Sequence, residues 1–179
     1  AVVGATGAVG SRIRHLLRDR NFPTSEIVPF ASERSAGKTL DDGLVVQGLV
    51  DDERLDGFDI AIFSAGGGVS REWAPKFAAR GATVVDNSSA FRMDDTVPLV
   101  VPEINASDVK NHRGIIANPN CTTAITLIAL YPLHQAFGVK RIFASSYQAV
   151  SGTGAKAIEE LERQVGEIVA GKPVTKEVY

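Results

Sequence analysis

The sequence predicts an α/β fold, with a doubly wound parallel sheet followed by the start of a second domain. Through residues 1–119, short apolar runs alternate with amphipathic helical patterns, which is typical of β-α-β units and a parallel sheet. A glycine-rich turn, residues 4–10, stands between the first apolar run and the first helical pattern. We therefore expect one domain over residues 1–119 and the beginning of another over residues 120–179.

Each expected element follows from a local pattern. Apolar runs predict strands at residues 1–3, 27–31, 44–49, 60–64, 83–86 and 115–117. Amphipathic or apolar patterns of helical period predict helices at residues 9–20, 70–80, 122–137 and 154–170. Residues 139–150 are rich in β-branched and aromatic side chains, so we expect a strand of a separate sheet there.

Both ends of the sequence interrupt a pattern. Glycine arrives after only three residues of the first strand, although strands usually last about five or six residues. At the other end, the helical pattern of residues 154–170 gives way to Lys172 and Pro173 with no obvious segment to pack on. We therefore expect the chain to be part of a longer protein.

Composition and charge argue against several classes of protein. Hydrophobic residues make up 44% and charged residues 22% of the chain, a globular rather than a disordered profile. A net charge of −2 without basic tracts argues against a nucleic-acid partner, and no apolar run reaches the roughly 18–20 residues that span a bilayer. Cys121 is the single cysteine and the histidines are scattered, so we expect no disulfide, no metal site and a cytoplasmic location.

The glycine-rich turn has the spacing G-x-x-G-x-x-G, from Gly4 through Gly7 to Gly10. Between a strand and a helix, such glycines allow a tight turn and a close approach of the backbone to a pyrophosphate, which the positive end of the helix dipole attracts. Its position predicts a Rossmann-type dinucleotide site. The alternative is a tight turn that binds no ligand.

The end of the second predicted strand indicates which dinucleotide binds. NAD-binding folds usually carry an acidic residue there for the ribose 2′-hydroxyl. Arg34, with Ser32 and Ser35, offers instead a guanidinium and hydroxyl donors for a 2′-phosphate, so we expect NADP. Glu33 leaves a second interpretation open, since it could serve the ribose or simply face solvent.

Cys121 follows a strand and a turn at the predicted start of a helix. A thiol in the first turn of a helix lies at the positive end of its dipole, which favours the nucleophilic thiolate, and nearby backbone N–H groups could stabilise an oxyanion. The alternative is a small buried side chain that only packs. Two further loops favour catalysis: residues 86–92, which carry Arg92 for a phosphate or carboxylate, and the polar, glycine-rich residues 147–154. For Arg92 the alternative is an exposed charge.

Together, residues 4–10, 86–92, 118–123 and 147–154 closely resemble the aspartate-semialdehyde dehydrogenases in order and spacing. The resemblance implies an NADP-dependent enzyme of lysine, threonine and methionine biosynthesis, with an α+β domain for catalysis and dimerisation. The resemblance also implies that a cysteine thiolate attacks the semialdehyde carbon, that hydride passes to NADP, and that phosphate releases the thioester as aspartyl phosphate. Biosynthesis would run the reverse reaction. A homodimer or homotetramer is implied, with small-molecule substrates and neither nucleic acid nor membrane as partner.

The resemblance also implies roles for individual residues. Cys121 would be the nucleophile, Gln148 would position the substrate, and Arg92 and Asn120 would hold the phosphate. The glycine turn would contact the cofactor pyrophosphate, and the loop after the second strand would contact its 2′-phosphate. The loop after residues 60–64 would line the same cleft, and the glycine-rich loop near residue 150 would lie close to the nicotinamide. The cofactor-binding residues would be Gly4, Thr6, Gly7, Ala8, Val9, Arg34, Ser35, Ser64, Ala65, Gly66, Ser151 and Gly152.

One part of the implied machinery has no match in this sequence. The resemblance places an acid–base histidine, and basic residues for the substrate carboxylate, in the second half of a chain about twice this length. None of His15, His112 and His134 occupies a matching position. Since general acid–base catalysis contributes roughly 10²–10⁴-fold, we expect residues 1–179 alone to turn over little substrate.

Three other functions stay open. N-acetyl-glutamyl-phosphate reductase uses the same thioester chemistry, but its cysteine neighbourhood differs from residues 118–123. Glyceraldehyde-3-phosphate dehydrogenase shares a Cys-Thr-Thr run but fits the glycine spacing less well. A non-catalytic Rossmann-type paralogue would keep the fold without the chemistry, and the joint presence of Cys121, Gln148 and Arg92 speaks against it.

Overall fold

The computed structural model describes residues 1–179, which divide into two compact units, Ala1–Ile142 and Phe143–Tyr179. The first unit contains a six-stranded sheet in which every pairing is parallel. This confirms the predicted doubly wound sheet. Its strands are β1 (Val2–Val3), β2 (Pro29–Ala31), β3 (Gln47–Gly48), β4 (Ile60–Phe63), β5 (Thr83–Asp86) and β6 (Ile115–Ala117).

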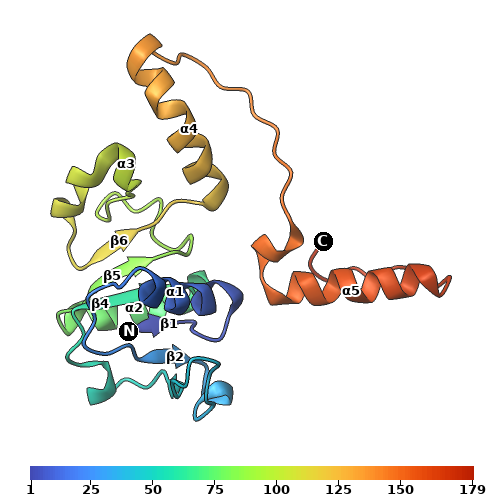
Figure 1. The fold of residues 1–179 in the computed structure, drawn as a ribbon, viewed down its shortest axis with the longest axis horizontal. Coiled ribbons are helices and arrows are strands. Elements are labelled where there is room, and N and C mark those ends of the chain that lie inside the picture. The colour runs from blue at the N-terminus through green and yellow to red at the C-terminus, as the bar shows by residue number, and fades with distance from the viewer. The chain divides into compact units, whose positions relative to one another are not determined.

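The strand order is β3-β2-β1-β4-β5-β6, so the chain first builds outward from β1 on one side and then, from β4, on the other (Figure 1). Right-handed crossovers in opposite directions place α1 (Ala8–Asp19) and α2 (Gly67–Ala79) on opposite faces of the sheet. In sheets of this order, ligands bind outside the carboxyl ends of the strands where the order reverses. That point lies between β1 and β4.

Phenylalanine rings form the core between α2 and the sheet. Phe77 of α2 packs edge-on against Phe30 of β2 and Phe63 of β4, with ring centroids 5.6 and 5.4 Å apart. All three side chains are fully buried. Burying a side chain of this size contributes about 1.5–3 kcal/mol relative to leaving it exposed, so this cluster holds α2 on the sheet and the ends of β2 and β4 in place.

The remaining elements of the first unit connect or extend the sheet. Short 3₁₀ segments span Glu33–Ser35, Glu53–Leu55 and Ala106–Asn111, and α3 covers Pro102–Asn105. After β6, α4 (Cys121–Phe137) ends at Gly138, whose left-handed φ of +69° stops the helix as predicted, and none of its residues is buried. No helix of the chain combines the length and the apolar character that crossing a bilayer requires.

The second unit is helical, with a 3₁₀ segment at Val150–Thr153 and α5 at Ala155–Val169. Residues 139–149 form no regular secondary structure, so the strand predicted for residues 139–150 is wrong. β-branched and aromatic residues favour a strand only where a neighbouring strand takes up its backbone hydrogen bonds, and no strand of the sheet pairs with these residues. The domain boundary predicted before residue 120 stays a prediction.

The tail formed by residues 175–178 is held against α5 by two carboxylates. Glu160 is 4% exposed and accepts hydrogen bonds from the backbone N–H groups of Glu177 (3.0 Å) and Val178 (2.5 Å). Glu167 accepts one from the backbone N–H of Thr175 (2.8 Å). The bond from Glu177 holds the pKa of Glu160 below its ordinary value, and the bond from Thr175 does the same for the pKa of Glu167.

Acid is expected to release this tail. A carboxylate whose pKa is lowered by folding stabilises the folded state above its ordinary pKa of 4.5, and this contribution is lost as the pH falls through the lowered value. The amide NMR resonances of Glu177 and Val178 should therefore shift on acidification below pH 4.5. Glu160→Gln should remove this pH dependence, whereas Glu159→Gln, at an exposed neighbour, should keep it. Identical titrations of the two variants would contradict the assignment.

Candidate functional site

Loops of the first unit gather at one edge of the sheet, because parallel strands all end on the same side. The predicted site residues of this unit lie in the loops after β1, β2, β4, β5 and β6, or at the start of the following helix. They are Gly4, Thr6, Gly7, Ala8, Val9, Arg34, Ser35, Ser64, Ala65, Gly66, Arg92, Asn120 and Cys121. The topology thus places motifs from distant parts of the sequence on a common edge.

The glycine turn has no room for a side chain at two of its glycines. Gly4 has a left-handed φ of +85°, and a Cβ there would collide with the backbone carbonyl of Ser64. A Cβ at Gly10 would collide with the carbonyl of Gly4. At Gly7 a Cβ would lie 3.4 Å from that same carbonyl oxygen and meet nothing else. Gly4 and Gly10 are therefore required by packing inside the protein, whereas Gly7 keeps the outer surface of the turn open.

The start of α1 is suited to an anion. Gly7 occupies the N-cap position, no side chain caps the helix, and its first turn contains no acidic residue. The first N–H groups of a helix have no partner inside the helix, and they lie at the positive end of its dipole. Thr6, Ala8 and Val9 are exposed, so this surface is accessible to a phosphate group.

The loop after β4 lies next to the glycine turn that follows β1. The backbone N–H of Ser64 donates to the carbonyl of Val3 at 2.8 Å, which brings the loop directly beside the glycine turn. Gly66 has a left-handed φ of +86° and begins α2 without a side-chain cap. Ser64 and Ala65 are half-buried and Gly66 is exposed.

The loop after β2 forms the 3₁₀ turn Glu33–Ser35. Arg34 is exposed and its guanidinium makes no hydrogen bond or ion pair within the chain, so it is available to an anionic ligand. Ser35 is half-buried, and its backbone N–H donates to the carbonyl of Ser32 at 2.8 Å. Glu33 is exposed as well.

A buried carboxylate organises the loop after β5. Asp86 is fully buried and accepts hydrogen bonds from the hydroxyls of Ser70 and Ser88, both at 2.7 Å, and from the Ser88 N–H at 3.1 Å. Ser70 comes from α2, and its contact with Asp86 was not predicted from the sequence. The sequence could only place this serine in a predicted helix, and that position does not show which residue of the sheet it contacts.

Arg92 ties the β5 and β6 loops together. Its Nε donates to the Asn118 carbonyl at 2.9 Å and its Nη2 to the Asn87 carbonyl at 3.1 Å. The side chains of the two asparagines also meet, Nδ2 of Asn118 donating to Oδ1 of Asn87 at 2.7 Å. Arg92 is half-buried, so the alternative interpretation as an exposed charge is wrong. No protein atom accepts a hydrogen bond from its Nη1, which leaves that group for a ligand.

Cys121 is the first residue of α4 and is exposed, which contradicts the alternative of a buried, packing cysteine. The side-chain oxygen of Asn120 caps the helix, accepting from the N–H groups of Thr122 (3.0 Å) and Thr123 (3.2 Å). Two of the first-turn donors expected to stabilise an oxyanion are therefore occupied by the cap. The backbone N–H of Cys121 and the side-chain Nδ2 of Asn120 remain.

Three predicted site residues lie in the second unit. Gln148, Ser151 and Gly152 are all exposed. A Cβ at Gly152 would collide with the side-chain amide of Gln148, so glycine allows these two residues to lie against each other. The relation of this loop to Cys121 stays a prediction.

None of the histidines lies beside the cysteine in the sequence or in its loop. His15, on α1, pairs with Asp41 at 3.0 Å. His112 accepts a hydrogen bond from the Gly114 N–H at 3.0 Å, and His134 lies in the last turn of α4.

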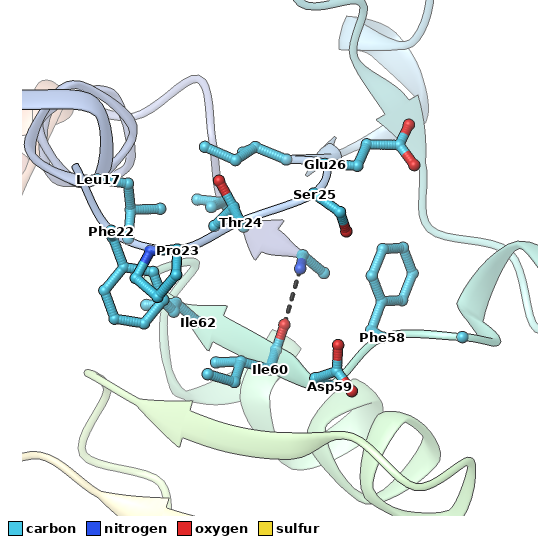
Figure 2. A pocket seen from close by; sticks show the side chains of 14 residues that line it. Leu17, Phe22, Pro23, Thr24, Ser25, Glu26, Phe58, Asp59, Ile60 and Ile62 are labelled. Atoms are coloured by element: carbon cyan, nitrogen blue, oxygen red, sulfur yellow. Dashed lines mark hydrogen bonds between the residues drawn. The ribbon is translucent and has the colours of Figure 1, made fainter.

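A cavity also lies at the opposite edge of the sheet. It has a volume of about 230 Å³, and its apolar wall includes Leu17, Phe22, Ile60 and Ile62 (Figure 2). The hydrogen bond drawn there joins the backbone nitrogen of Ala1 to the Ile60 carbonyl at 2.8 Å. Because the cavity adjoins the amino ends of β1 and β4, and ligands of such sheets bind at the carboxyl ends, we assign it no role.

Two family models match the chain. Residues 1–112 match the NAD binding domain of semialdehyde dehydrogenase, and residues 130–179 match the dimerisation domain of semialdehyde dehydrogenase. The first match covers more than half of the chain and contains the glycine turn, Arg34 and Arg92.

Curated relatives agree with these matches. The chain is 53% identical to an aspartate-semialdehyde dehydrogenase of Aquifex aeolicus, over 98% of this chain and 53% of that protein, and 47% identical to one of Bacillus subtilis, over 99% and 52%. The chain therefore spans about half the length of the curated relatives it matches.

Solved structures share the fold as well. Aspartate semialdehyde dehydrogenase II of Vibrio cholerae, complexed with ASA, superposes with a TM-score of 0.92 at 43% identity, over 99% of this chain and 54% of that one. The enzyme of Candida albicans, solved with NADP, gives 0.60 at 29% identity, over 78% and 47%. The resemblance inferred from the sequence motifs is confirmed, and the chain belongs to the semialdehyde dehydrogenase family.

Proposed function

We propose that this chain forms part of an NADP-dependent aspartate-semialdehyde dehydrogenase, which reduces aspartyl phosphate to aspartate semialdehyde through a thioester on a cysteine. The observation that carries the proposal is the exposed thiol of Cys121 at the start of α4, on the edge of the sheet that also carries the glycine turn and Arg92. The names of relatives about half identical to this chain support the choice of substrate.

The residues present fit a dinucleotide. The glycine turn packs without side chains at Gly4 and Gly10, and the uncapped start of α1 offers exposed N–H donors to a pyrophosphate. Residues 6–9 would hold that pyrophosphate, and Arg34 with Ser35 would hold a 2′-phosphate, which favours NADP. Ser151 and Gly152 would lie near the nicotinamide. When bound in its reduced form, the cofactor supplies the hydride for the redox half of the reaction.

The chain's own residues would carry the acyl transfer. The Cys121 thiolate attacks the acyl carbon of aspartyl phosphate, forming the thioester as phosphate leaves. The Cys121 N–H and the side-chain amide of Asn120 can donate to the oxygens that gain charge in this step. The free Nη1 of Arg92 and the side-chain amide of Asn120 bind the phosphate, and Gln148 positions the substrate.

We also propose a homodimer or homotetramer in the cytoplasm. The match of residues 130–179 to a dimerisation domain supports the oligomer. The cytoplasmic location rests on the single cysteine, which rules out an intrachain disulfide framework.

An activity assay on the enzyme at its natural length tests the function. Aspartate semialdehyde should reduce NADP over repeated turnovers only when phosphate is present, whereas N-acetylglutamate semialdehyde and glyceraldehyde 3-phosphate should react poorly. A preference for either of the other aldehydes would favour the corresponding dehydrogenase. Cofactor binding without turnover of any aldehyde would favour the non-catalytic paralogue.

Asn120→Asp is expected to separate phosphate binding from helix capping. Aspartate caps a helix as well as asparagine does, so the melting temperature should stay near that of the wild type. The variant lacks the side-chain N–H donors and adds a negative charge, so kcat/KM for phosphate should fall by about 10²-fold or more. Asn120→Ala, the control, loses the cap too and should be less stable by about 1 kcal/mol. A wild-type kcat/KM for phosphate in Asn120→Asp would contradict the assigned role.

A further inference from the structure

A buried arginine joins α1 to a loop far along the chain. Arg14 is 1% exposed and donates to the carboxylates of Asp41 (3.0 Å) and Asp42 (2.7 Å). Arg18 donates to the backbone carbonyl of Asp42 at 3.1 Å, and Nε2 of His15 lies 3.0 Å from Asp41. These five residues are called the α1 clamp below.

The clamp holds the tip of a hairpin, residues 37–46. Its arms are joined by the bond from the Gly37 N–H to the Val46 carbonyl (2.9 Å) and by the bond from the Leu40 N–H to the Leu44 carbonyl (2.8 Å). Asp41 and Asp42 form the tip between these arms. The second arm runs into β3, at the edge of the sheet.

The base of the hairpin adjoins the turn that carries Arg34. The Lys38 N–H donates to the Ser35 carbonyl at 3.2 Å, so the first arm begins where the 3₁₀ turn Glu33–Ser35 ends. A Cβ built on Gly48 of β3 would lie 3.6 Å from the Ala36 side chain, in ordinary contact. The turn is thus fixed between β3 and a hairpin whose tip is anchored to α1.

The clamp is built to fix geometry. A buried ion pair adds little net stability, because desolvating both charges offsets most of their attraction, and in some proteins such pairs serve instead to specify where their partners lie. The buried Nε of Arg14 has no hydrogen-bond partner, which further reduces what this side chain adds to stability. The ring of His15 and the two carboxylates are close enough to hold a metal ion, yet the guanidinium of Arg14 already occupies an oxygen of each carboxylate.

We propose that the α1 clamp is a positioning device for cofactor selection. It fixes the hairpin, and through it Arg34 and Ser35, in the position that receives the 2′-phosphate of NADP. This inference rests on the proposed function, in which these two residues bind that phosphate. Because NAD has no 2′-phosphate, losing the clamp weakens the use of NADP and leaves the use of NAD unchanged.

The test compares the two cofactors in the enzyme at its natural length. In Arg14→Gln, the ratio of kcat/KM with NADP to kcat/KM with NAD should fall by about tenfold or more, through a higher KM for NADP at an unchanged kcat. The ratio for Arg14→Lys should lie between those of the wild type and Arg14→Gln. The compact ammonium of lysine keeps the charge but lacks the forked guanidinium that reaches both carboxylates. A general loss of structure would lower both values together and leave the ratio unchanged.

Two further variants keep the test decisive. If Arg14→Gln does not fold, Asp41→Asn replaces a side chain that is 58% exposed and leaves the buried pair of Arg14 and Asp42 intact; it should lower the ratio in the same direction. Arg80→Gln, the control, breaks the ion pairs of α2 with Asp51 and Asp56 and should leave the ratio unchanged.

The outcomes separate this inference from the proposal on which it rests. A strong NADP preference that survives in the foldable clamp variants overturns the inference alone. Equal losses with both cofactors in these variants also overturn it. If the wild-type enzyme has the same kcat/KM with NAD as with NADP, the cofactor proposal and the inference are overturned together.

Discussion

Replacing Cys121 by serine is expected to reduce turnover by about 10³-fold or more. The hydroxyl is a far weaker nucleophile than a thiolate at neutral pH, so the thioester cannot form and phosphate-dependent reduction of NADP stops. The side chain is exposed at the start of α4. Its replacement should therefore change the free energy of unfolding by no more than about 0.5 kcal/mol.

Three measurements on the Cys121→Ser variant check this expectation: steady-state turnover, thermal unfolding and NADP titration. Turnover should collapse while the melting temperature and the affinity for NADP stay near those of the wild type. Substantial residual turnover would remove Cys121 from the role of nucleophile. Weakened NADP binding together with a lower melting temperature would assign the residue a structural role instead.

The second large effect is expected at Gly4. Alanine there would require a left-handed φ of +85° and would press its Cβ against the Ser64 carbonyl. The conformational strain amounts to about 1–2 kcal/mol and the overpacking to about 1–3 kcal/mol. Gly4→Ala should therefore lower the free energy of unfolding by about 2–5 kcal/mol and abolish NADP binding, because the glycine turn and the β4 loop must move apart.

Denaturant unfolding and NADP titration of Gly4→Ala measure both effects. Gly68→Ala serves as a matched control: it lies within α2, and its Cβ would meet no atom within 4 Å. That variant should be neutral or more stable by about 0.5–1 kcal/mol, because alanine has the higher helix propensity. A Gly4→Ala protein with wild-type stability and NADP affinity would contradict the packing described for the turn.

The fold could be predicted from the sequence because its parallel strands are short, apolar and separated by helices. Residues 83–86 and 115–117 were predicted with the bounds that the structure shows for β5 and β6. The parallel arrangement then places every strand's C-terminal loop on one edge, so motifs such as the glycine turn and Cys121 could be assigned to one region without knowledge of their contacts.

What the sequence could not reveal depends on long-range contacts. Arg14 lies on an otherwise amphipathic helix, and its partners Asp41 and Asp42 follow 27 and 28 residues later, so nothing local shows that it is buried. The capping role of Asn120 was missed although asparagine before a helix is a usual cap. A local signal also existed for α3, where Pro102 stands at the first position of the helix.

The most direct test of the proposed thioester mechanism is to trap the acyl-enzyme. The enzyme at its natural length is mixed with aspartate semialdehyde and NADP without phosphate, and NADPH absorbance and intact protein mass are followed. The mechanism predicts a single-turnover burst of NADPH, with an aspartyl thioester on Cys121 that added phosphate discharges. NADPH formation that continues without phosphate, or an adduct on any residue other than Cys121, would contradict it.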